Sequence, residues 1–114
     1  VVEMQIDGRH LNRSGVLHGG VIATLLDASC GYAATWSGDP AKPKAAVTLS
    51  LTVSYTGQVK EGVVRATALM KAGGRKIVFC TGEVRDAAGN LIGMGEGSFR
   101  FRSGSERESP VASA

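Results

Sequence analysis

One stretch constrains the fold of this chain more than any other. Residues 17–36 read LHGGVIATLLDASCGYAATW. Apolar residues recur through this stretch at helical spacing, so we predict one long buried helix from Gly19 to Trp36. Its single acidic residue, Asp27, falls in the middle. A carboxylate in apolar surroundings costs free energy unless it is paired or used. Asp27 is therefore either an acid satisfied by its neighbours or a catalytic group at the edge of a cavity.

The rest of the chain reads as strands separated by turn residues. Val47–Tyr55 alternates strictly, with apolar residues on one face and Ser or Thr on the other, which is typical of a strand. Gly73–Gly74 is a tight hairpin signal. Glycines alternate between residues 93 and 97, so one face of the last strand is nearly bare backbone that a helix or ligand could approach. The predicted strands cover residues 1–6, 47–55, 62–72, 75–86 and 91–102, and breaker residues at 37–44 predict a loop.

A single helix followed by strands with short antiparallel connections predicts an α+β domain. The helix would lie across the concave face of a curved antiparallel sheet of about five to six strands. The 114 residues suffice for one domain and are too few for two. We assign that domain to residues 1–102. Residues 103–114, SGSERESPVASA, have the composition of a flexible C-terminal tail.

Composition disfavours several classes of function. The net charge is only +3, the basic residues are scattered and aromatics make up 5% of the chain, which argues against a nucleic-acid partner. Cys30 and Cys80 lie in apolar segments without zinc-ligand spacing, so we expect buried free thiols, no metal site and a cytoplasmic location. No signal peptide is visible. The apolar stretch is nearly long enough to span a bilayer, but Asp27 at its centre argues against a membrane.

The start of the predicted helix is suited to act together with Asp27. The first backbone N–H groups of a helix have no intrahelical partner and carry partial positive charge. Glycine lets a substrate approach the backbone closely, so Gly19 and Gly20 are candidates for an oxyanion hole that polarises a carbonyl. One helix would then supply an activator of an electrophile and, two turns later, a carboxylate. Such an arrangement suits attack on an acyl carbon.

The motif N-x-x-G-x-x-H-G-G over residues 12–20, followed by T-L-x-D over residues 24–27, supports this chemistry. It resembles the signature of hot-dog-fold acyl-CoA thioesterases of the PaaI-like group, relatives of the 4-hydroxybenzoyl-CoA thioesterases. The order of strands and hairpins also follows that family over roughly residues 1–102. The resemblance implies a hot-dog fold and hydrolysis of an acyl-CoA by water. It implies no metal and no cofactor, since coenzyme A is part of the substrate.

The resemblance also implies a role for each residue of the motif. Asp27 would be the nucleophile, or the general base that activates water. A backbone N–H of Gly19–Gly20 would polarise the thioester carbonyl, and Asn12 would hydrogen-bond near that carbonyl or the leaving sulfur. Thr48, on the polar face of its strand, matches a hydroxyl residue that helps to place the water. His18 is a candidate acid or base, although its ring more simply holds the loop before the helix.

In this family the active site forms between two subunits. The resemblance therefore implies a homodimer in which Asn12 and Gly19 of one chain face Asp27 of the other, and dimers that pair into tetramers. For the CoA nucleotide phosphates we prefer the basic pair Arg75–Lys76 beside Gly74 at the hairpin. A solvated strand edge that resists aggregation explains these two cations equally well. The acyl group stays open among aryl-acetyl, hydroxybenzoyl and medium-chain groups.

Two other functions compete with thioester hydrolysis. A hot-dog dehydratase or hydratase usually needs a catalytic His with an acid, and the Asn-His-Gly-Gly-Asp layout fits hydrolysis better. A non-catalytic acyl-CoA-binding or regulatory module would be favoured by a missing acid or by a fused DNA-binding segment. Asp27 is present and no such segment occurs in these residues. We therefore favour the enzyme.

Overall fold

The computed structural model describes residues 1–36, 41 and 43–111. Within these residues it contains one α-helix, α1 (Gly19–Thr35), a short 3-10 helix, η1 (Gly8–His10), and five strands. The expected helix and all five expected strands are confirmed to within two residues at each end. Most of the predicted loop at 37–44 lies outside the described residues. The strands are β1 (Val2–Gln5), β2 (Ala46–Tyr55), β3 (Val63–Gly73), β4 (Ile77–Arg85) and β5 (Leu91–Phe101).

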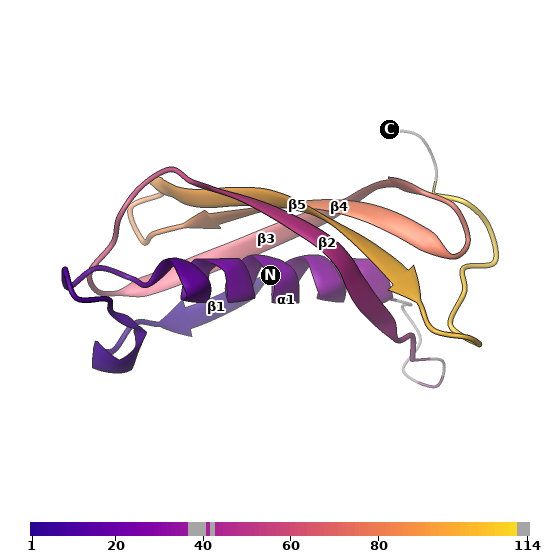
Figure 1. Cartoon of the computed structure of the whole chain (residues 1–114), viewed down its shortest axis with the longest axis horizontal. Coiled ribbons are helices and arrows are strands. Elements are labelled where there is room, and N and C mark those ends of the chain that lie inside the picture. The colour runs from indigo at the N-terminus through magenta and orange to yellow at the C-terminus, as the bar shows by residue number, and fades with distance from the viewer. Residues whose placement is uncertain (37–40, 42, 112–114) are drawn as a thin grey trace.

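The strands form one antiparallel sheet in the order β1-β3-β4-β5-β2. The sheet arches over α1, which runs along its concave side (Figure 1). This is the predicted α+β arrangement. β1 and β2 are the two edge strands of the sheet, so the outer edge of β2 has no neighbouring strand within the described chain. The same strand carries Thr48.

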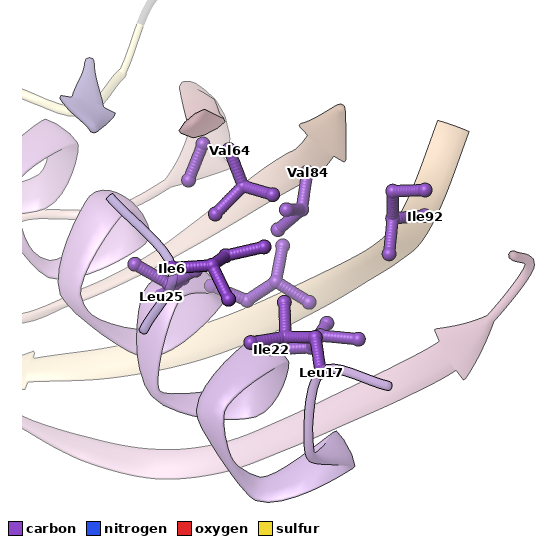
Figure 2. Packing of buried hydrophobic residues seen from close by; sticks show 9 residues of the cluster. Ile6, Leu17, Ile22, Leu25, Val64, Val84 and Ile92 are labelled. Carbon is purple, nitrogen blue, oxygen red and sulfur yellow. The ribbon is translucent and has the colours of Figure 1, made fainter. Parts of the chain in front are cut away.

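The hydrophobic core lies between α1 and the sheet and is split into two clusters. The first surrounds the N-terminal half of α1 and includes Ile22 and Val64 (Figure 2). Leu26 and Val64 are fully buried. The second surrounds its C-terminal half and includes Phe99. Both clusters hold the helix against the sheet by apolar burial, which contributes roughly 25 cal/mol per Å² of buried area. Asp27 lies between the clusters along α1, where it is half-buried rather than part of the core.

The alternating glycines of β5 let the helix and a neighbouring strand come close. A Cβ atom on Gly93 would lie 2.7 Å from Cγ2 of Ile22 on α1. On Gly95 it would lie 2.5 Å from the carbonyl oxygen of Thr52. Contacts this short are not tolerated, so these positions need glycine. The expectation that a helix lies against this bare face is confirmed.

The alternation along β2 is interrupted by a bulge. Thr48 pairs with Phe99 and Ser50 pairs with Ser98, which leaves Leu49 as the extra residue. One extra residue in a strand turns the side chains that precede it to the opposite face of the sheet from the one that regular alternation predicts. Thr48 therefore points toward α1, on the same face as Leu51, and not to the opposite polar face. The prediction of one unbroken alternation from Val47 to Tyr55 is wrong for this reason.

Residues 103–111 make ordered contacts with the end of the sheet. The hydroxyl of Ser105 is buried and accepts a hydrogen bond of 3.0 Å from the N–H of Ala45. The N–H of Val111 donates to the carbonyl of Gly73 over 3.0 Å. These contacts differ from what a flexible tail suggests, although residues 112–114 lie outside the described residues. The domain boundary at residue 102 stays a prediction.

Candidate functional site

Asp27 and Thr48 are joined by a hydrogen bond between the helix and β2. Oγ1 of Thr48 donates to Oδ1 of Asp27 over 2.7 Å. The bulge at Leu49 makes this contact possible, because it turns Thr48 toward the helix. No other described residue donates to the Asp27 carboxylate, so Oδ2 is available for chemistry. The structure thus brings together two residues of the predicted site that are far apart in sequence.

A cavity of about 370 Å³, here called the Asp27 cavity, opens between α1 and the start of β2. On the helix side it is lined by Asp27, Gly31 and Thr35, which lie on successive turns. On the strand side it is lined by Lys44 and Thr48. The carboxylate is therefore placed at a cavity wall, as the catalytic interpretation of a lone helix acid requires.

His18 caps the start of α1 and thereby distinguishes the two glycines that follow it. Nδ1 of His18 accepts a hydrogen bond of 2.8 Å from the N–H of Gly20. That N–H is engaged and cannot also serve a substrate. The N–H of Gly19, by contrast, has no acceptor among the residues that the structure describes. Of the two predicted oxyanion donors, Gly19 is the available one.

Asn12 organises the loop before the helix with one end of its side chain. Its Oδ1 accepts hydrogen bonds from the N–H groups of Ser14, at 2.9 Å, and Val16, at 3.3 Å. This is the local turn geometry that Asn favours. Its amide Nδ2 donates to no acceptor in the described part of the chain. Asn12 and Gly19 line a second cavity of about 410 Å³, here called the Gly19 cavity.

The two cavities contain different halves of the predicted site. Asp27 follows Gly19 by eight residues, and at 1.5 Å per residue the two lie about 12 Å apart along α1. Asn12 and Gly19 line one cavity, whereas Asp27 and Thr48 line the other. Within one chain, the described residues do not bring the predicted donors and the carboxylate to a common point.

The candidate CoA-binding cations lie at the β3–β4 hairpin and line neither of these cavities. Nε of Arg75 donates to the carbonyl of Arg107 over 3.0 Å, so Arg75 is partly engaged by the C-terminal segment. Lys76 lines a third cavity, together with Glu106. The pKa of Glu106 is lowered chiefly by backbone N–H groups, with smaller contributions from Lys76 and Arg75. Gly74 closes the hairpin, its N–H donating to Ile77 over 2.9 Å.

Two residues of the cavities were not expected at these places. The hydroxyl of Tyr55 donates to the carbonyl of Gly19 over 3.1 Å. Its ring would lie only 3.1 Å from a Cβ on Gly19, so the ring lies directly against that glycine. Lys44 lines the Asp27 cavity from the loop before β2. No local pattern signals either role, because both depend on segments that are distant in sequence.

Cys30 and Cys80 are buried free thiols, as predicted. Burial raises the pKa of each thiol to about 11, and the Asp27 carboxylate adds to this effect at Cys30. The thiolate is the nucleophilic form of cysteine. Neither cysteine is therefore suited to act as a nucleophile near neutral pH. No helix in the described ranges is long and apolar enough to cross a membrane.

Comparison with known protein families gives a match over most of the chain. The sequence profile of the Thioesterase superfamily matches residues 14–92. A putative esterase of Pseudomonas aeruginosa is 39% identical over 62 residues, which cover 54% of this chain and 45% of that protein. Acyl-coenzyme A thioesterase 13 of Mus musculus is 28% identical over 96 residues, which cover 83% of this chain and 67% of that protein. The chain thus spans about half the length of the bacterial relative.

A similar fold occurs among solved structures. A Bacillus halodurans protein whose crystal structure includes CoA superposes on this chain with a TM-score of 0.80 at 28% sequence identity. The superposition covers 88% of this chain and 69% of the other. The likeness therefore includes the helix and the sheet that carry both cavities.

Proposed function

The chain belongs to the thioesterase superfamily and has the hot-dog fold, and from that basis we propose that it hydrolyses acyl-CoA thioesters. The products are a free acid and CoA, and the acyl group is a small aryl or medium-chain group. The single observation that carries the proposal is the Asp27–Thr48 pair at the wall of a cavity. The name of the mouse relative and the CoA in the Bacillus structure support the substrate class.

In the proposed reaction Asp27 takes one of two roles. It attacks the thioester carbonyl carbon to form a mixed anhydride, which water then hydrolyses to regenerate the carboxylate, or it takes a proton from a water molecule that attacks that carbon directly. The carbon–sulfur bond breaks, the water oxygen ends in the acid, and the sulfur leaves as the CoA thiol with a proton. Thr48 donates to Oδ1 of Asp27 and so holds the carboxylate in one orientation. Oδ2 is then the atom that reacts. Positioning of this kind lowers the entropic cost of the chemical step.

Gly19 and Asn12 supply the proposed donors to the carbonyl oxygen. The N–H of Gly19 stands at the N-terminus of α1, where the helix adds partial positive charge. The amide Nδ2 of Asn12 lies in the same cavity and donates to the carbonyl or to the leaving sulfur. Donors oriented in advance stabilise the charge that develops in the transition state. His18 has a positioning role, because its ring engages Gly20 and leaves Gly19 available.

We propose that the site is completed in a homodimer. The Asp27 cavity includes the start of β2, and the Gly19 cavity includes its end at Tyr55. Two copies that pair their free β2 edges antiparallel around a two-fold axis place the start of one β2 beside the end of the other. That pairing would bring Gly19 and Asn12 of one subunit to Asp27 of its partner. Assembly of such dimers into tetramers is part of the same proposal.

The remaining assignments rest on sequence and are carried forward as proposals. Arg75, Lys76 and Gly74 would bind the phosphates of CoA, with Arg75 released in part from the C-terminal segment. The reaction needs neither a metal nor a cofactor, because the carboxylate and the backbone donors supply the chemistry. The chain would act in the cytoplasm, where its thiols stay reduced.

The test is release of free thiol from a panel of aryl- and medium-chain acyl-CoAs. We expect the wild-type protein to release CoA, and Asp27→Asn to lose at least 100-fold in kcat because the carboxylate is gone. We expect Asn12→Ala to lose roughly 100-fold, since removal of an oriented donor commonly has that effect. Glu96→Gln, an exposed carboxylate of β5, is the matched control and should keep wild-type activity. If the wild-type protein releases no thiol from any substrate, the proposed function is wrong. If Asp27→Asn keeps full activity, the proposed site is wrong.

A further inference from the structure

The Asp27 cavity has a reactive end and a far end. Along α1 its lining runs from Asp27 to Thr35, and along the strand side it runs from Thr48 back to Lys44. The helix and the strand segment thus pass the cavity in opposite directions. Eight helical residues rise about 12 Å. The cavity therefore extends from Asp27 toward Lys44.

The middle of this cavity is kept open by the absence of a side chain. A Cβ on Gly31 would come no closer than 3.9 Å to Cε1 of Phe99, which is ordinary contact. Packing does not require glycine at this position, unlike at Gly95. A glycine inside a helix costs about 1 kcal/mol relative to alanine. Gly31 thus leaves open volume beside Phe99 in the middle of the cavity.

A basic residue, Lys44, lines the far end. Its side chain is half-buried, and Nζ donates to the carbonyls of Ser105, over 3.3 Å, and Glu106, over 3.0 Å. An ammonium group has three N–H donors, so the third has no acceptor among the residues that the structure describes. No carboxylate of the described residues lies within ion-pair distance of Lys44. A partly desolvated charge with an unused donor gains free energy from an acceptor.

The C-terminal segment holds Lys44 in place. The N–H of Ala45 donates to Oγ of the buried Ser105 over 3.0 Å, and the N–H of Arg102 donates to the carbonyl of Ala45 over 2.9 Å. Lys44 is thus fixed through its own side chain and through the next residue. A donor fixed before binding loses little entropy when a ligand arrives.

We propose that Lys44 determines substrate specificity by selecting acyl groups that carry a hydrogen-bond-accepting oxygen at the end distant from the thioester. This inference rests on the proposed thioesterase function. The distal oxygen accepts the third N–H of the Lys44 ammonium, while the thioester carbonyl lies at Asp27. A methyl-terminated acyl group of the same length leaves that donor unpaired. Sites built to hydrogen-bond a substrate discriminate strongly against analogues that lack the partner.

The experiment compares acyl-CoAs in matched pairs: octanoyl with 8-hydroxyoctanoyl and with the monothioester of octanedioic acid, and phenylacetyl with 4-hydroxyphenylacetyl. We expect the wild-type protein to favour an oxygen-bearing member by 10-fold or more in kcat/KM. Lys44→Met should reduce that ratio to about one by raising KM, and Lys44→Arg should retain most of it. Lys71→Met, an exposed lysine of β3, is the control. Comparison of the hydroxyl-bearing acyl-CoAs with the carboxylate-bearing one shows which distal oxygen is preferred.

Two outcomes would overturn the proposal. If Lys44→Met lowers stability but leaves the preference unchanged, Lys44 has a structural role. If it weakens all acyl-CoAs equally and has no effect on thioesters of N-acetylcysteamine, which lack the nucleotide, Lys44 contacts CoA. Failure of the proposed thioesterase function can be told apart from both of these outcomes by a binding measurement. Calorimetric binding of the same ligands to Asp27→Asn reports the preference even if the wild-type protein hydrolyses none of them.

Discussion

At the scale of single residues, the orientation of Asp27 depends on one hydroxyl group. Thr48→Val preserves the shape of the side chain and removes the donor to Oδ1. We expect kcat to fall by about 10-fold or more with little change in KM, because the carboxylate loses its fixed orientation but the cavity keeps its shape. Steady-state kinetics on the best acyl-CoA of the panel provides the measurement.

Thr52→Val is the matched control for this change. Thr52 is exposed on the opposite face of β2, and its hydroxyl donates to no described residue. Equal losses in the two variants would mean that the effect comes from the strand and not from Asp27. An unchanged kcat in Thr48→Val would show that the hydrogen bond has no part in the reaction.

At the start of the helix, one side chain determines which backbone N–H group is free to bind a substrate. Nδ1 of His18 accepts from Gly20, so the capping interaction that begins α1 also decides which N–H group stays available. Capping side chains contribute about 1 kcal/mol to helix stability. The most economical interpretation of His18 is therefore structural, and it acts on the proposed chemistry only through Gly19.

At the scale of elements, glycine has opposite meanings in α1 and β5. Gly31→Ala should raise the free energy of unfolding by up to about 1 kcal/mol, because helix propensity improves and the new methyl group meets only Phe99 at 3.9 Å. Gly95→Ala should lower it by roughly 1–3 kcal/mol, because the methyl group would lie 2.5 Å from the backbone oxygen of Thr52. Urea denaturation of the two variants measures both.

The same pair tests the use of the Asp27 cavity. Gly31→Ala should lower kcat/KM for the longer acyl groups more than for acetyl-CoA, since the methyl group occupies the middle of the cavity. A destabilised Gly31→Ala would mean that packing, and not open volume, accounts for this glycine. A neutral Gly95→Ala would contradict the close approach of β2 and β5.

The bulge in β2 is the element-scale feature on which the candidate site depends. If residues 48–50 alternated regularly, with no bulge at Leu49, Thr48 would face away from α1 as Ser50 does. The bulge thus converts a polar residue of the outer face into a partner for Asp27. Bulges occur often beside active sites, where they re-aim a side chain.

At the scale of the whole molecule, the proposed site requires two chains, and mixing inactive variants tests this directly. Asp27→Asn and Asn12→Ala each damage one half of every site. In a mixed dimer, one of the two sites collects both changes and the other has neither. Random exchange of equal amounts should therefore restore activity to about a quarter of the wild-type value. Recovery is measured after the two inactive proteins have been incubated together.

Two controls accompany the mixing experiment. Mixing Asp27→Asn with Thr48→Val should give no more than the mean of the two activities measured separately, because both residues line the same cavity and come from the same chain. Sedimentation velocity should show a dimer or a larger species. Absence of recovery in exchanging dimers would mean that each site lies within one chain.

Much of the fold follows from the sequence by itself. Helical spacing of apolar residues and a capped glycine start determine α1, and alternating glycines determine where it packs on β5. These features are local, because periodicity and backbone sterics act over a few residues. The motif around Asp27 was likewise enough to identify the thioesterase superfamily, which the profile match confirms.

Only the tertiary structure decided which atoms meet. The orientation of Thr48 depends on the register between β2 and β5, and a single bulge changes it without altering the apparent alternation in the sequence. The position of Lys44 depends on carbonyls more than sixty residues away, in a segment whose composition suggested a tail. Availability of Gly19 depends on the rotamer of His18. Such pairings between distant segments leave no local signal, since they arise only when the folded chain satisfies its buried polar groups.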